Sequence, residues 1–156
     1  MRVSIRKSVR RPAIKIAPIR EAVENTLTGE RRTDAEVSVL IVNDARIREL
    51  NRSFRGVDAP TDVLAFPMAE GEFASVNPDL LGDVVISADR AEVQARQAGH
   101  DLMREIQLLA VHGTLHLLGY EDRTQAGCSR MMKLARTYLK GRPLSGGEGP
   151  STAALP

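Results

Sequence analysis

A long amphipathic helix is predicted from about Leu102 to Leu118, and its apolar side must be covered by other elements. Apolar or small residues recur there at intervals of three and four, the spacing that puts side chains on one face of a helix. They are Ile106, Leu109, Ala110, Gly113 and Leu117. The best strand candidate in the chain is the segment VSVLIV (37–42), whose residues are β-branched and apolar.

The remaining elements follow from apolar periodicity and from Gly, Pro and capping residues. Further strands are predicted at Val3–Lys7, Thr61–Phe66 and Gly82–Ser87. Further helices are predicted from Pro18 to Gly29, after Asn43 and Asp44, from Ser87 or Asp89 to Gln97, and from Arg130 to Lys140. We therefore expect an α+β fold: a single domain over residues 1–140, with helices packed on a small mixed sheet of about four strands. The Gly- and Pro-rich tail, residues 141–156, is expected to be disordered.

Composition limits the classes of function. Hydrophobic residues make up 42% of the 156 residues and charged residues 27%, as in globular proteins. The formal net charge of +2 permits nucleic acid as a partner without indicating it. Aromatic residues make up only 3% and Trp is absent, so composition does not indicate a platform for base stacking.

Cys128 is the only cysteine, which excludes a disulfide framework and a Cys-rich zinc ribbon. The basic N-terminal segment has no long apolar stretch, and no segment approaches the roughly 18 apolar residues of a membrane span. We therefore expect a reducing compartment, the cytoplasm, and no membrane.

Two histidines in the long helix predict a metal site. His112 and His116 are four residues apart, so both imidazoles leave one face of the helix and can bind the same ion. Gly119 can take the left-handed conformation that ends a helix, which would let the chain turn back and bring Asp122 to that ion. Two imidazoles and a carboxylate leave a fourth position open for water, as in catalytic zinc sites.

Other interpretations of these residues stay open. The two histidines could be hydrogen-bonded core residues, and Glu121 competes with Asp122 as the third ligand. A zinc protease of the His-Glu-x-x-His type carries its general base directly after the first histidine, where this chain has Gly113. A metalloprotease-like hydrolase is therefore an alternative function. His100 is expected to make a structural hydrogen bond and not to bind the metal.

At these residues the sequence resembles the YbeY family, bacterial endoribonucleases involved in ribosomal RNA maturation. The segment HGTLHLLGYED (112–122) is similar to the family pattern His-Gly-x-Leu-His-Leu-x-Gly-Tyr-Asp-His. The likeness extends to LNRSFRGVDAPTDVLAFP (50–67), LGDVVIS (81–87) and AGHDLMREIQLLAVHG (98–113). It covers roughly residues 37–122, in the order in which the family has these segments.

The resemblance implies a single-strand-specific, metal-dependent endoribonuclease. The implied role is late ribosomal RNA processing, namely 16S rRNA 3′ end maturation, and ribosome quality control. The implied cofactor is one divalent metal ion per chain, Zn²⁺ above others, held by His112, His116 and Asp122. The implied partners are ribosomal RNA and the small ribosomal subunit. No DNA is expected, and the sequence does not indicate the oligomeric state.

The sequence departs from the family pattern at the third ligand. Asp122 stands where the family has a histidine, and Glu121 stands where it has an aspartate. A carboxylate can bind zinc, but its negative charge lowers the net charge of the metal and its ligands, so the pH optimum or the metal preference would differ. The loss of the third histidine also leaves open a non-catalytic ribosome-assembly factor in which the metal only stabilises the C-terminal region.

Phosphodiester cleavage also needs a cation that binds the phosphate. Arg55 matches the functionally important arginine of the family, and its planar guanidinium suits a phosphate. We expect Arg55 and His112 to be catalytic, with Arg55 binding the phosphate. Asp62 and Asp83 are expected to cap turns or hold loops.

Overall fold

The computed structural model describes residues 1–68 and 77–140 of the chain. Within these ranges five helices pack on a sheet of four strands, as the sequence predicted. In chain order the elements are β1 (Arg2–Lys7), α1 (Ile16–Gly29), β2 (Glu36–Val42), α2 (Asp44–Arg55), β3 (Val63–Pro67), β4 (Leu80–Ser87), α3 (Ala88–Ala98), α4 (Leu102–Leu117) and α5 (Gln125–Leu139). The tail expected to be disordered, residues 141–156, lies outside the described residues.

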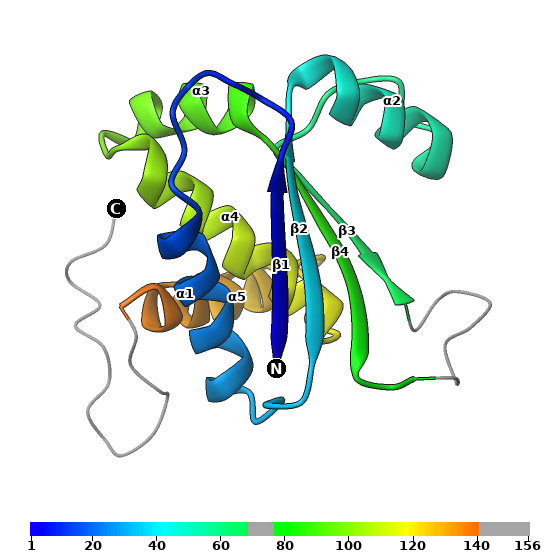
Figure 1. Cartoon of the computed structure of the whole chain (residues 1–156), viewed down its shortest axis with the longest axis vertical. Helices are drawn as coiled ribbons and strands as arrows, with labels where there is room; N and C mark the ends of the chain where they lie inside the picture. The colour runs from blue at the N-terminus through cyan, green and yellow to red at the C-terminus, as the bar shows by residue number, and fades with distance from the viewer. Residues whose placement is uncertain (69–76, 141–156) are drawn as a thin grey trace.

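The sheet is mixed, with the strand order β1-β2-β4-β3 (Figure 1). β1 and β2 are parallel, and so are β2 and β4, whereas β3 is antiparallel to β4 and forms one edge. β3 and β4, which are consecutive in the chain, thus pair with each other. β3 also contacts α4, the helix that contains His112 and His116.

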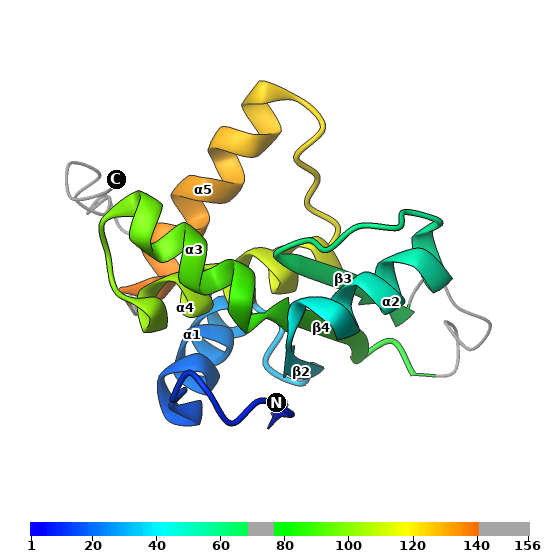
Figure 2. The same ribbon diagram turned by 90° about the horizontal axis from the view of Figure 1, so that it is seen from above.

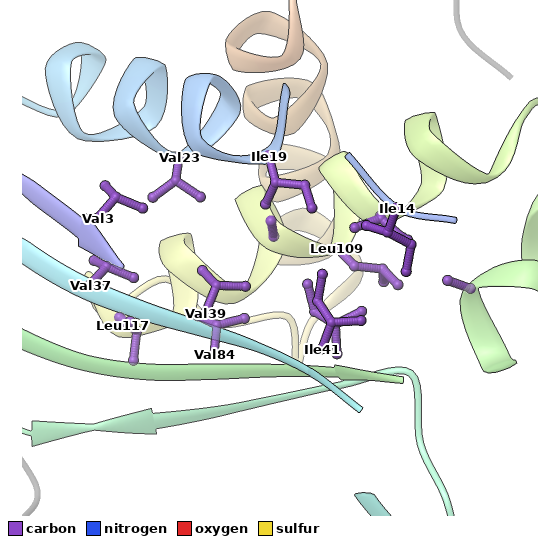
Figure 3. Packing of buried hydrophobic residues seen from close by; sticks show 14 of the residues in the cluster. Val3, Ile14, Ile19, Val23, Val37, Val39, Ile41, Val84, Leu109 and Leu117 are labelled. Atoms are coloured by element: carbon purple, nitrogen blue, oxygen red, sulfur yellow. The ribbon is translucent and has the colours of Figure 1, made fainter. Parts of the chain in front are cut away.

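The main core lies between one face of the sheet and α1 and α4 (Figure 3). Alternate residues of β2, Val37, Val39 and Ile41, point to this side and are almost fully buried. α4 meets them with the apolar side predicted from its spacing, including the buried Leu109 and Leu117. α5 packs on the outside of α1 and α4, where Tyr138, Met131 and Leu134 form a second apolar cluster with α4.

The opposite face of the sheet is covered only in part. Among the described helices, only α2 covers this face (Figure 2), and it buries Ile47 against Val42, Leu64 and Val85. Asn43 caps this helix, as predicted, by accepting a hydrogen bond from the backbone N–H of Arg46 at 2.8 Å. The last turn of α2 is exposed, and this is where Arg55 stands.

One predicted boundary was wrong by a full turn. The last helix begins at Gln125 and not at Arg130, because the side chain of Thr124 caps it by accepting a hydrogen bond from the N–H of Gly127. The first turn of α5 carries no large apolar residue, so apolar periodicity could not detect it. No helix in the described ranges is long and apolar enough to cross a membrane.

Candidate metal centre

Two imidazoles of α4 and one carboxylate from the segment after it meet at the surface. The Nε2 atoms of His112 and His116 lie 3.0 Å apart. The Oδ2 atom of Asp122 lies 3.5 Å from each of these nitrogens. Among the described residues, these three side chains form the one group of His, Cys, Asp or Glu whose ligand atoms converge in this way, all within 4.8 Å of one another.

The position of the histidines depends on how closely α4 approaches the sheet. Gly113 follows His112 on the buried side of the helix, and a Cβ atom there would lie 2.5 Å from Cγ1 of Val84 on β4. A larger residue would push the helix away from the sheet. This close packing leaves no room beside His112 for the glutamate of a zinc protease.

A tight turn after α4 brings the carboxylate back to the histidines. Gly119 has φ of +102°, a conformation that other residues rarely adopt, and the N–H of Tyr120 donates to the carbonyl of Leu115. Asp122 is thereby directed to the imidazoles, whereas the carboxylate of Glu121 lies 4.0 Å from the Arg123 guanidinium. The geometry favours Asp122 over Glu121 as the third ligand.

The orientation of His116 is set by its second ring nitrogen. Nδ1 lies 3.0 Å from the backbone carbonyl oxygen of Tyr120, and a carbonyl can only accept a hydrogen bond. The proton of a neutral His116 therefore belongs on Nδ1, and Nε2 keeps a lone pair directed at His112 and Asp122. Metal-binding histidines in proteins are oriented by the same kind of contact.

The Tyr120 side chain is anchored in turn. Its hydroxyl donates to Oε1 of Glu30 at 2.7 Å, and the hydroxyl of Tyr138 donates to the other oxygen of the same carboxylate. Glu30 directly follows α1, and Tyr138 belongs to α5. Two segments distant in sequence, the end of α1 and α5, thus hold the residue whose carbonyl orients His116.

The electrostatics of the site favour neutral imidazole. Burial lowers the pKa of His112, and the neighbouring His116 lowers it further, against opposing effects of Asp122 and Asp62. The neutral ring is the form that binds a metal ion.

The three side chains fit a tetrahedral metal ion. With bonds of about 2.0–2.1 Å, two ligand atoms of such an ion lie about 3.4 Å apart. The three separations here are 3.0, 3.5 and 3.5 Å, close to the edges of one face of that tetrahedron. The donor set of two imidazoles and one carboxylate suits zinc and leaves a position open toward the cavity in front of it.

This cavity has a volume of about 570 Å³ and is lined by the three ligands, by Arg55 at the end of α2 and by β3. Arg55 is exposed, and its guanidinium makes no ion pair or hydrogen bond with any residue of the described ranges. A free guanidinium in the same cavity as a metal site is suited to bind an anion. The structure therefore brings together all four predicted site residues.

The other titratable residues have the structural roles that the sequence suggested, with one exception. Asp62 holds the start of β3: its carboxylate accepts from the N–H of Val63 at 2.7 Å and from Gln94 at 3.2 Å. His100 bonds to the carboxylate of Glu105 at 2.7 Å, away from the metal ligands. Asp83 neither caps a turn nor holds a loop; it lies within β4, on the face of the sheet that α2 covers in part.

Sequence reasoning missed Glu30 and the hydroxyl of Tyr120. Glu30 stands in a polar run after a helix, 90 residues before Tyr120, and no local pattern connects the two. Only the packing of α1 against α4 brings them together.

The chain is similar to known proteins over most of its length. The family model described as Endoribonuclease YbeY matches residues 6–142. A protein named Endoribonuclease YbeY from Moorella thermoacetica is 51% identical over 114 residues, which cover 69% of this chain and 73% of that protein. One of the same name from Geobacter sulfurreducens is 42% identical over 134 residues, covering 85% and 89% of the two chains. The solution structure of TM1509 from Thermotoga maritima superposes with a TM-score of 0.63 and 27% identity, covering 89% of this chain and 87% of that one.

Proposed function

The chain belongs to the YbeY family and is an endoribonuclease, and on this premise we propose that it cuts single-stranded ribosomal RNA in the cavity between α4 and the end of α2. The proposed role is late processing of ribosomal RNA, with 16S rRNA 3′ end maturation as its main step, and ribosome quality control. The proposed partner is the small ribosomal subunit, and the proposed compartment is the cytoplasm.

The observation that carries this proposal is that Arg55 and the three metal ligands line the same cavity. A phosphodiester in the cavity would be within reach of the guanidinium as well as of the ligands. Arg55 can donate two parallel hydrogen bonds to phosphate oxygens and offset the charge that develops during cleavage.

The proposed cofactor is one divalent ion per chain, zinc above others, held by His112, His116 and Asp122. When bound, such an ion supplies Lewis-acid polarisation and activation of the attacking oxygen. The protein's own contribution is positioning. Tyr120 orients His116 through its carbonyl, and the turn at Gly119 directs Asp122, so that the donor atoms are in place before RNA arrives.

The proposal is tested with purified, metal-analysed protein and two variants, His116→Ala and Arg55→Glu, on single-stranded and double-stranded RNA and on a peptide library. Arg52→Glu is the matched control, because Arg52 is an exposed arginine of the same helix that does not line the cavity. We expect cleavage of single-stranded RNA by the wild type and by Arg52→Glu, and its loss in both site variants.

Other outcomes would contradict specific parts of the proposal. Cleavage that persists in His116→Ala would come from a contaminating nuclease. Cleavage of peptides would support a metalloprotease-like hydrolase. Bound metal without cleavage of either substrate would support a non-catalytic assembly factor.

A further inference from the structure

A second cavity lies on the partly covered face of the sheet, beside the metal centre. It has a volume of about 750 Å³. Its floor is formed by outward-facing residues of β2 and β4, including Ser38 and Asp83, and α2 forms one wall.

The two cavities adjoin each other. Arg55, Ala65 and Pro67 line both of them, so the cavities meet at the end of α2 and along the edge strand β3. A polymer with one unit at the metal centre can therefore reach the second cavity past Arg55.

An aromatic pair stands at the entrance. The rings of Phe54 and Phe66 have centroids 5.5 Å apart and planes at 65°, an edge-to-face contact. Phe54 is 69% exposed, although it is one of only three phenylalanines in the chain. Phe66 thus fixes the Phe54 ring without covering it, and the ring stands next to Arg55 in sequence.

The charges favour a base over a phosphate inside the second cavity. Asp83 lies on its floor, and partial burial raises the pKa of its carboxyl. Arg46 on the wall is already paired with Glu49 at 2.8 Å. The free cation is Arg55, at the junction of the two cavities. A phosphate is therefore attracted to the junction, and the apolar rings beyond it suit the flat face of a base.

We propose that Phe54, supported by Phe66, is a stacking site for the base of a nucleotide next to the scissile phosphate, so that single-stranded RNA runs from the metal centre past Arg55 into the second cavity. This inference rests on the proposed function. It explains selection of single strands, because a base within a duplex is stacked on its neighbours and is not free to contact a side chain.

The test combines protein variants with RNA that lacks single bases. Phe54→Leu keeps an apolar side chain and removes the ring, whereas Phe54→Tyr keeps the ring. Val93→Ala is the control, because Val93 is a partly exposed apolar residue on α3 that lines neither cavity. Each protein is assayed on one short single-stranded RNA and on a series with an abasic nucleotide at successive positions around the cleaved bond.

We expect Phe54→Leu to raise the RNA concentration for half-maximal cleavage about tenfold, because it removes the aromatic face on which one base stacks. Phe54→Tyr and Val93→Ala should behave as the wild type. In the wild type, an abasic nucleotide at one or two adjacent positions should cause the same loss, and in Phe54→Leu it should cause no further loss.

Three outcomes would overturn the inference. If Phe54→Leu cleaves RNA like the wild type, no base stacks on Phe54, and the second cavity is then a surface for a protein partner. If the losses from Phe54→Leu and from the abasic nucleotide simply add, the ring and the base do not contact each other. If the wild type cleaves no RNA at all, the proposed function fails together with this inference.

Discussion

Asp122, which together with Glu121 departs from the family's sequence pattern, places one carboxylate oxygen equally far, 3.5 Å, from both histidine nitrogens. We predict that Asp122→Ala weakens zinc binding by on the order of 100-fold, because loss of outer contacts to metal ligands alone costs 10–100-fold. Titration of metal-free protein with zinc measures this. Asp122→His should retain binding, and unchanged occupancy in Asp122→Ala would show that the third ligand lies elsewhere.

The hydroxyls of Tyr120 and Tyr138 both donate a hydrogen bond to the carboxylate of Glu30, so the two tyrosines can be compared directly. Each Phe substitution should lower the free energy of unfolding of the metal-free protein by about 1.5–3 kcal/mol, since each removes a hydrogen bond to a charged group. Only Tyr120→Phe should also weaken zinc binding, because only Tyr120 orients His116 through its carbonyl. Chemical unfolding and zinc titration of both variants measure the two effects. Equal zinc affinity in the two variants would show that the Glu30 contact does not support the site.

At the same scale, the sequence was sufficient for residues whose chemistry is local. The spacing of His112 and His116 and the glycine that follows define a site formed within one short segment. Phe54 is a residue for which the sequence was not sufficient. It is seven residues from Ile47, a spacing that puts both on the same face of a helix, but Ile47 is fully buried and Phe54 is 69% exposed. Periodicity identifies a face of a helix, and only the three-dimensional arrangement shows how far the sheet extends beneath it.

Among the elements, α4 packs closely on β4 at Gly113, where a Cβ atom would meet Val84. We predict that Gly113→Ala lowers the free energy of unfolding by about 1–3 kcal/mol, as overpacking of a core does, although alanine is by itself the better helix former. Val84 carries the methyl group that a new Cβ would meet at 2.5 Å. Thermal unfolding measures the loss.

The double variant Gly113→Ala, Val84→Ala provides the control for this prediction. Shortening Val84 removes the obstructing methyl groups and should restore part of the stability lost in Gly113→Ala, relative to Val84→Ala alone. Simple addition of the two losses would contradict the packing explanation.

The existence of each element could be predicted from its pattern, whereas their order in the sheet could not. β1, β2 and β4 are parallel and β3 is antiparallel at the edge, a choice that depends on how the helices cross over one face. The start of α5 was missed for a different reason. Its first turn is held by the cap at Thr124, and its side chains contribute little to any apolar face.

For the whole molecule, a net charge of only +2 means that RNA is not held by a general positive field. Binding should then depend on few phosphate contacts. We predict that Arg55→Ala lowers the slope of log K against log salt concentration by about 0.7, the value for one phosphate contact on a single strand. Arg52→Ala, on the same helix but outside the cavity, should leave the slope unchanged. RNA binding at several salt concentrations measures both, and equal slopes for the two variants would remove Arg55 from the phosphate site.

All three proposed metal ligands come from one short stretch of chain, residues 112–122. An unfolded chain therefore keeps them near one another, and closing so short a loop around an ion costs little entropy. Metal would then bind the unfolded protein appreciably, and added zinc would raise the melting temperature less than its affinity for the native state suggests. The ion would therefore be able to bind before the domain has folded, and folding would then bring Arg55 close to it.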